Sequence, residues 1–139
     1  MFEHILVPTD LTDRNRRAME IAIKMALENS CKLTLLHVVE TIEDMDTEEF
    51  RKFYKALGLR ADKKMDELMA QSRRQDMVIE KQVLFGRRVF EILSFADVNG
   101  VDLIIMSSHR LDVENASAGW GTISYKVGVM SHCPVLLVK

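Results

Sequence analysis

Strand-like and helix-like segments alternate along the chain, and this alternation limits the fold more than any other feature of the sequence. Five segments have the short apolar runs of β-strands, and residues with the spacing of an amphipathic helix lie between them. The expected strands are Ile5–Val7, Leu33–Val39, Met77–Leu84, Val101–Met106 and Val135–Val138. Several of them are apolar on both faces, which is typical of strands buried in a parallel sheet. We therefore predict an α/β fold, with an open five-stranded parallel sheet and helices on both of its faces.

Four segments show the spacing of helices that cover a sheet. In the first, one apolar stripe is formed by Ala18, Ile21, Ala22, Met25 and Ala26. The second, over about residues 47–74, is the longest. A third lies between Gly86 and Asn99, and a fourth precedes Pro134. A polar loop from Ser107 onward separates the fourth strand from the last helix.

The size and charge of the chain exclude several classes of protein. Its 139 residues suit a single domain, which we place at residues 1–139. A net charge of −2 gives no bulk attraction to nucleic acid or to an anionic membrane. No apolar run approaches the length of a membrane helix, and the first residues lack the pattern of a signal peptide. We therefore expect a soluble, intracellular protein that has neither nucleic acid nor a membrane as a partner.

Patterns that indicate catalysis or metal binding are missing from the sequence. The two cysteines, Cys31 and Cys133, are too few for a disulfide framework or a zinc site. The 4 histidines fall on different expected elements, without the spacing of metal ligands. No Ser-His-Asp or Cys-His set can be argued. We expect no catalytic residue and no metal.

A candidate binding crevice follows from the expected sheet. Ligands of open parallel sheets bind beyond the carboxyl ends of the strands, where the strand order reverses. If the first and fourth strands flank that point, Pro8-Thr9-Asp10 faces Met106-Ser107-Ser108-His109. Asp10 either contacts a ligand there or caps the following helix, and a capping carboxylate can do both.

Four segments resemble those of the universal stress protein family. They are His4–Asp10, Leu33–Glu40, Val101–Met106 and Cys133–Val138, and they follow one another in the family's order over the whole chain. The resemblance implies a Rossmann-like α/β domain of strand order 3-2-1-4-5, found in the cytoplasm and usually dimeric. Some members of this family bind ATP, and others do not.

The phosphate-binding motif of the ATP-binding members is altered in this sequence. In those members the fourth strand leads into Gly-x2-Gly-x9-Gly-(Ser/Thr), whose glycines let the backbone approach the phosphates. Here Ser107 and Arg110 stand at the first two glycine positions, and Gly121-Thr122 follows with one residue more than the motif has. Because a Cβ atom disfavours glycine-like conformations, we expect a rearranged loop and no ATP binding in the usual way.

Other residues leave nucleotide binding open. Arg110 could give a guanidinium to a phosphate, but Asp112 and Glu114 oppose it in the same loop. The pair Arg87-Arg88 after Gly86 could meet a phosphate or a ribose, or simply be solvated. Trp120 could stack on a base or plug the crevice. The candidate nucleotide crevice consists of Pro8, Thr9, Asp10, Val38, Met106, Ser107, His109, Arg110, Gly121 and Thr122.

The last strand predicts an interface between two copies of the chain. In the order 3-2-1-4-5 the third and fifth strands are the sheet edges, and the third carries polar residues that discourage pairing. The fifth is apolar throughout, with Val135, Leu136, Leu137 and Val138. An apolar edge strand favours aggregation unless it is covered. We therefore predict a homodimer in which the two last strands pair antiparallel across a two-fold axis.

Taken with the resemblance, these features predict a non-catalytic stress-response or regulatory protein of the universal stress protein type. We expect no resident cofactor, and ATP is the candidate if there is one. Two alternatives stay open. One is a nucleotide-binding sensor with a remodelled phosphate loop and, at most, slow hydrolysis of ATP. The other is a scaffold that binds protein partners through the surface of the long helix.

Overall fold

The computed structural model describes residues 1–42, 47–71, 77–108 and 122–139. Five parallel strands form one sheet in the spatial order β3-β2-β1-β4-β5. Their bounds are β1 (His4–Pro8), β2 (Lys32–Glu40), β3 (Ile79–Gly86), β4 (Leu103–Ser107) and β5 (Val135–Val138). This confirms the predicted fold class and the strand order that the family resemblance implied.

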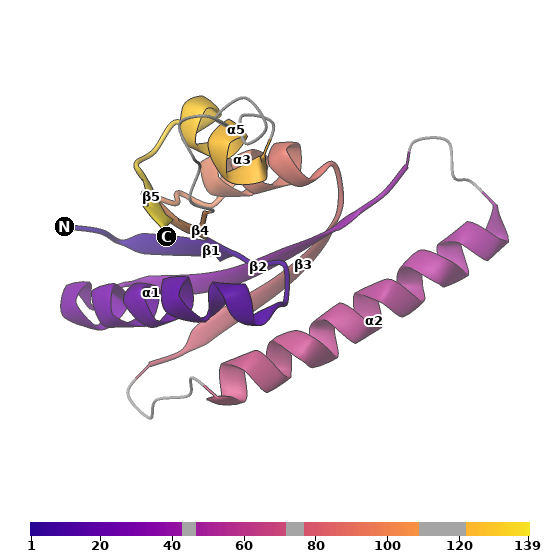
Figure 1. The fold of residues 1–139 in the computed structure, drawn as a ribbon, viewed down its shortest axis with the longest axis horizontal. Helices are drawn as coiled ribbons and strands as arrows, with labels where there is room; N and C mark the ends of the chain where they lie inside the picture. The colour runs from indigo at the N-terminus through magenta and orange to yellow at the C-terminus, as the bar shows by residue number, and fades with distance from the viewer. Residues whose placement is uncertain (43–46, 72–76, 109–121) are drawn as a thin grey trace.

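Helices cover both faces of the sheet. They are α1 (Arg16–Asn29), α2 (Glu48–Gln71), α3 (Arg88–Val98) and α5 (Ile123–Met130), and a 3-10 turn η1 (Asp13–Asn15) precedes α1. Helices α1 and α2 lie on one face, and α3 and α5 lie on the other (Figure 1). Among the helices that the structure describes, none combines the length and the apolar character needed to span a membrane.

The hydrophobic core has two layers because successive side chains of a strand point to opposite faces of the sheet. In β1, Ile5 and Val7 pack with α1 and with Met65 of α2. Leu6, between them, points the other way and packs with Ile92 of α3 and with α5. The strands therefore read as continuous apolar runs, as expected for a sheet that is covered on both sides.

The predicted position of β3 and the predicted start of α3 are each wrong by two residues. Strand β3 begins and ends two residues later than predicted, and Gly86 is its last residue rather than the first residue of a helix. Gly86 has φ +152°, a conformation that side chains rarely adopt, so the chain leaves the sheet there before α3 begins at Arg88. Ser107, expected in a loop, is the last residue of β4.

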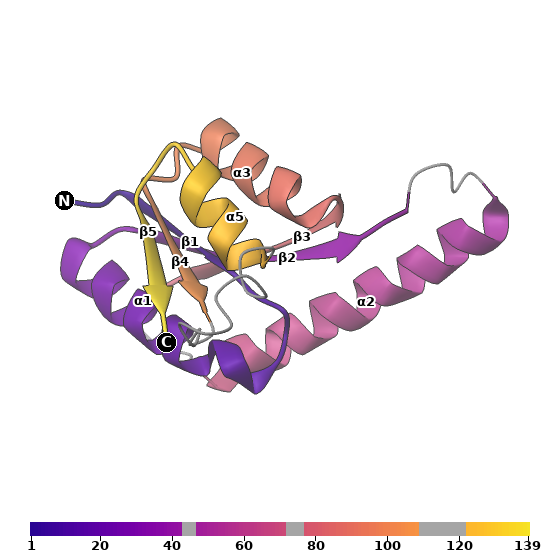
Figure 2. The same ribbon diagram turned by 45° about the horizontal axis from the view of Figure 1, so that its top comes forward.

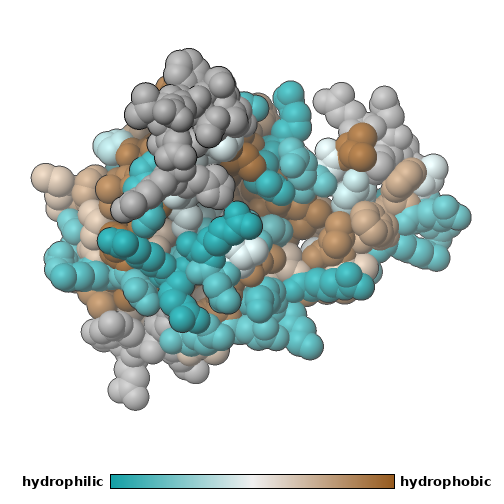
Figure 3. Space-filling model, in the orientation of Figure 1, coloured by the Kyte–Doolittle hydropathy of each residue, from teal (hydrophilic) through white to brown (hydrophobic). Residues whose placement is uncertain are grey.

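Helix α2 is attached to the sheet mainly through its second half. Its fully buried side chains are Ala61 and Met65. Its amino-terminal half extends away from the rest of the molecule in both ribbon views (Figures 1 and 2). Phe50 and Phe53 remain exposed in that half. In Figure 3, apolar surface gathers over this part of α2 and the adjoining strands. The predicted helix residues 72–74 lie outside the described part of the chain.

Candidate functional site

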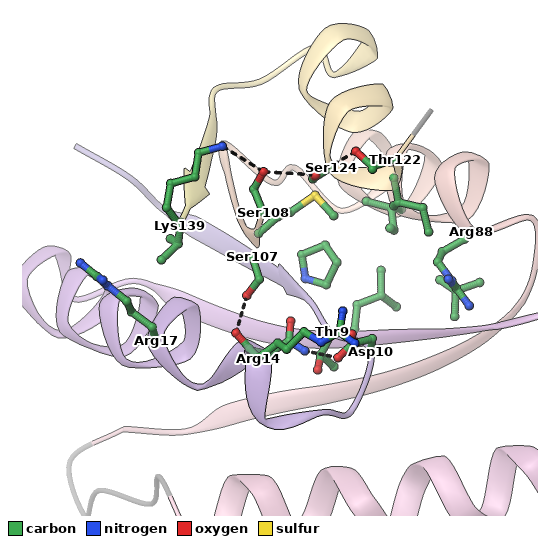
Figure 4. A pocket seen from close by; sticks show the side chains of 18 residues that line it. Thr9, Asp10, Arg14, Arg17, Arg88, Ser107, Ser108, Thr122, Ser124 and Lys139 are labelled. Carbon is green, nitrogen blue, oxygen red and sulfur yellow. Dashed lines mark hydrogen bonds between the residues drawn. The ribbon is translucent and has the colours of Figure 1, made fainter. Parts of the chain in front are cut away.

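A cavity of about 430 Å³ lies at the carboxyl ends of β1 and β4, where the strand order reverses (Figure 4). Its lining comes from β1, β2, β4 and β5, from the start of α1, and from the first turns of α3 and α5. The lining residues are Pro8, Thr9, Asp10, Arg14, Asn15, Arg17, Leu36, Val38, Arg88, Ile92, Met106, Ser107, Ser108, Thr122, Ile123, Ser124, Val138 and Lys139. Its volume is within the range of small-molecule sites.

Most of the predicted crevice residues meet around this cavity. Those that line it are Pro8, Thr9, Asp10, Val38, Met106, Ser107 and Thr122. The other three, His109, Arg110 and Gly121, lie outside the described residues, as do Asp112, Glu114 and Trp120. The structure thus brings the seven described residues together at one cavity, and their role as a nucleotide site stays a prediction.

The turn after β1 holds the Asp10 carboxylate in place. Asp10 Oδ1 accepts hydrogen bonds from the backbone N–H of Thr12 at 2.9 Å, from the Thr12 hydroxyl at 2.6 Å, and from the side-chain amide of Asn15. The residue at the N-cap position of α1 is Asn15, so Asp10 closes the turn before the helix instead of capping it. The carboxylate is thus oriented by its own turn at the mouth of the cavity.

The same contacts keep Asp10 ionised. Burial alone would raise the pKa of Asp10, but the hydrogen bonds from Thr12 and Asn15 and the positive charge of Arg14 outweigh it. The net effect holds the pKa of Asp10 below its ordinary value. A fixed anion of this kind suits hydrogen-bond donors of a ligand, such as ribose hydroxyls or an exocyclic amine.

A row of hydroxyl groups crosses the opposite wall of the cavity at the start of α5. Lys139 Nζ donates to Ser108 Oγ at 3.2 Å, Ser124 Oγ lies 3.5 Å from Ser108 Oγ, and Thr122 Oγ1 lies 3.3 Å from Ser124 Oγ (Figure 4). Thr122 is also the N-cap of α5. A cation, several hydroxyls and the amino end of a helix at one place favour an anionic group.

Basic side chains outnumber acidic ones around the cavity. Among the described lining residues the cations are Arg14, Arg17, Arg88 and Lys139, and the only acidic side chain is Asp10. Ser107 Oγ donates to the backbone oxygen of Arg14 at 3.0 Å, which joins the end of β4 to the start of α1. The charge of the described lining is therefore opposite in sign to the net charge of the chain, and it favours a phosphate or another anion.

The remaining lining is apolar. Leu36 and Val38 of β2, Ile92 of α3 and Met106 of β4 form this side, and all four are buried. Arg88 lies beside it and pairs with Glu40 at 3.7 Å. The cavity thus combines an apolar side that fits a flat ring system with a polar, cationic side that fits phosphate.

The sequence patterns did not identify Arg14, Arg17, Ser124 and Lys139 as site residues. For Arg88 they left open whether it contacts a ligand or is simply solvated. Arg14 and Arg17 are three residues apart, so they share one face of the segment that follows β1. Lys139 directly follows the carboxyl end of β5. The rule that ligands bind beyond the carboxyl ends of the strands pointed to these positions too.

Within the described ranges, no three His, Cys, Asp or Glu side chains gather closely enough to hold a metal ion.

Comparison with known proteins relates the whole chain to one family. A model described as the universal stress protein family matches residues 1–139. The "universal stress protein in QAH/OAS sulfhydrylase 3′ region" of Thermus aquaticus is 34% identical over 144 residues that cover 100% of both chains.

Solved structures of the same type share the fold. The structure of the hypothetical protein MJ0577 has a TM-score of 0.83 at 28% identity and covers 100% of this chain and 96% of its own. A universal stress protein in complex with cAMP has a TM-score of 0.69 and covers 99% of this chain and 97% of its own. At 20% identity, the second of these similarities shows the fold alone.

Proposed function

Since the chain belongs to the universal stress protein family, we propose that it is a cytoplasmic, non-catalytic regulatory protein that binds an adenine nucleotide. The ligand occupies the cavity at the carboxyl ends of β1 and β4. This is the sensor alternative raised by the sequence, with the phosphate held in a different way from the family's glycine motif. Because the chain shares its family with a universal stress protein solved in complex with cAMP, that complex supports a nucleotide as the class of ligand.

The observation that carries this proposal is the division of one cavity into an apolar side and a cationic side. The base lies against Val38, Ile92 and Met106. The phosphate lies between Lys139, Ser108 and the start of α5 on one wall and Arg14 on the facing wall. Charged side chains and hydroxyls here replace the backbone contacts that glycines allow in ATP-binding members, because Ser107 carries a side chain at the first glycine position.

Titration calorimetry with adenosine, AMP, ADP and ATP tests the proposal. We expect the phosphate-bearing ligands to bind at least about tenfold more tightly than adenosine, because a hydrogen bond to a charged group contributes about 1.5–3 kcal/mol. Their affinity should fall as salt is added, since salt screens charges. Equal affinity for adenosine, or no heat with any nucleotide at millimolar concentration, would contradict it.

A pair of lysine variants locates the phosphate. Lys139→Ala removes the cation at the end of the hydroxyl row and should weaken ADP binding about tenfold. Lys126→Ala, on the exposed side of α5, changes the net charge equally and should leave the affinity unchanged. The non-catalytic part of the proposal is tested by incubating ATP with the protein, and formation of ADP would contradict it.

We also propose that two copies pair through β5. Within the described part of the chain this strand is hydrogen-bonded only to β4, and Leu136 and Leu137 are 38% and 37% exposed. Antiparallel pairing of two β5 strands across a two-fold axis would cover these side chains and the open edge of the sheet.

The scaffold remains a second candidate because the amino-terminal half of α2 carries exposed aromatic side chains. Phe50 is 40% exposed and Phe53 is 57% exposed, and large exposed apolar patches often mark interaction sites. A protein partner that binds the native chain and is lost with Phe53→Ser, but not with Lys52→Ser, would support this role. Equal binding by both variants would exclude this face of α2.

A further inference from the structure

A second cavity, of about 410 Å³, lies between α1 and α2 on one face of the sheet. Its lining residues are Val7, Thr9, Thr12, Asp13, Asn15, Arg16, Met19, Glu20, Leu35, Leu68 and Gln71. Both helices pack over β2, but α1 also covers β1 and β4, whereas α2 also covers β3. The helices leave a gap over the neighbouring register partners Val7 and Leu35.

The lining of this second cavity is largely apolar inside, apart from the buried polar residues Thr9 and Asn15, and its rim carries more acidic than basic side chains. Val7 and Leu35 form its floor, Met19 of α1 and Leu68 of α2 form its sides, and the first three of these are buried. The charged residues of the rim are Asp13, Arg16 and Glu20, which are exposed. Two carboxylates and one guanidinium give an excess of negative charge, opposite to the excess of cations around the first cavity.

We propose that the second cavity is a separate binding site for a small organic amine with an apolar body. The apolar part of such a ligand lies between Met19 and Leu68, and its ammonium group lies at the rim by Glu20 and Asp13. A phosphate-bearing ligand is disfavoured there by the same carboxylates. The volume is within the range of small-molecule sites and suits a ring with a short side chain.

The two cavities share Thr9 and Asn15 as parts of their walls. The side-chain amide of Asn15 donates to the Asp10 carboxylate at the mouth of the first cavity and to the backbone oxygen of Thr12 at 3.3 Å. A ligand in the second cavity therefore contacts a residue that orients Asp10. The second site itself does not depend on what the first cavity binds.

Titration of the full chain with 2-phenylethylamine, followed by two-dimensional amide NMR, tests this site. A ligand of this size binds in about the millimolar range. We expect saturable shifts of the Asn15 side-chain amide and of the residues around Leu68. The uncharged analogue 2-phenylethanol should bind more weakly, and ethylamine, which lacks the apolar body, should cause no saturable shift.

Two pairs of variants show where the probe binds. Leu68→Trp fills the cavity and should abolish the shifts, whereas Leu59→Trp, at an exposed leucine of the same helix, should preserve them. Glu20→Gln should weaken binding by about two- to fivefold, whereas Glu28→Gln, farther along α1, should not.

Saturable binding that survives Leu68→Trp, or no binding by 2-phenylethylamine, would overturn the proposal. Should Leu68→Trp fail to fold, an equal affinity of Glu20→Gln and Glu28→Gln would overturn it as well.

Discussion

Two residues with positive φ shape the turns that lead out of β1 and β3. Gly86, at φ +152°, ends β3, and Leu11, at φ +67°, lies in the turn that carries Asp10. A bulky side chain in the left-handed region is uncommon, and here the backbone N–H of Leu11 donates to Thr9 Oγ1 at 3.0 Å. These turns place Asp10 and the start of α3 at the cavity.

Gly86→Ala tests the turn after β3. Alanine at φ +152° should lower the free energy of unfolding by about 1–3 kcal/mol, because side chains rarely adopt this conformation. Its Cβ would also come within 2.5 Å of Glu91 Oε1, so that side chain must move. Gly128→Ala, in α5 with open space around it, is the matched control and should raise stability by about 0.5–1 kcal/mol. Urea unfolding measures both, and equal effects would contradict this reading of Gly86.

The acid sensitivity of the fold should depend in part on Asp10. Because the pKa of Asp10 is lower in the folded protein than in the unfolded chain, its ionised form stabilises the fold above the unfolded value. That contribution is lost as the pH falls through the folded pKa. At neutral pH we expect Asp10→Asn to have a lower Tm than the wild type, and the difference should shrink below about pH 4. A difference in Tm that stays constant down to pH 2 would show that Asp10 is not held in this way.

At the scale of elements, α2 stands apart from the other helices because only two of its 24 residues are buried, against two of 11 in α3 and two of 8 in α5. Ala61 and Met65 anchor it to the sheet. Lys81 of β3 adds ion pairs to Asp62 at 3.0 Å and Asp66 at 2.6 Å. These ion pairs are partly exposed and contribute little on their own. The attachment of α2 therefore depends mainly on Met65.

Met65→Ala should lower the free energy of unfolding by about 2–5 kcal/mol, the usual cost of such a cavity in a core. Leu59→Ala, at a leucine of α2 that is 65% exposed, should change it by less than about 0.5 kcal/mol. Hydrogen exchange in Met65→Ala should also speed up along α2 more than along α1. Equal costs for the two variants would mean that α2 is not anchored at Met65.

The elements themselves could be predicted from apolar spacing, and so could the bounds of β5, but the ends of β3 and the start of α3 could not. The stripe from Ala18 to Ala26 and the apolar run of β2 fix a helix and a strand by repetition over several residues. The boundary at Gly86 depends on one backbone angle, which apolar spacing does not encode. The spatial order of the strands came from the family resemblance, because the pattern of a parallel strand does not identify its neighbour.

At the scale of the whole molecule, the position of the candidate site could be predicted from the sequence, but its excess of positive charge could not. The carboxyl ends of β1 and β4 brought Asp10 and Ser107 together as expected. The cationic character was missed because Arg14 and Lys139 belong to segments that meet only in the folded sheet. The two acidic residues in the loop after β4 argue against a phosphate ligand. The described walls of the cavity carry more cations than anions and favour one.

The assembly predicted for the whole molecule is a dimer through β5. Light scattering at micromolar concentration should give about twice 16.0 kDa. Leu136→Lys should halve that mass, because it places a charge on the paired edge. Leu59→Lys, at an exposed leucine of α2, should leave the mass unchanged. A monomer for the wild type, or a dimer that survives Leu136→Lys, would contradict pairing through β5.

The central claim is that side-chain cations of the first cavity hold the phosphate of a nucleotide. Arg14 lines that cavity, and Arg16, two residues later, does not. The most direct measurement is the affinity for ADP of the wild type, Arg14→Ala and Arg16→Ala by titration calorimetry. We predict a loss of about tenfold or more for Arg14→Ala and less than about twofold for Arg16→Ala. Equal affinities for the two variants, or no measurable binding of ADP by the wild type, would contradict the claim.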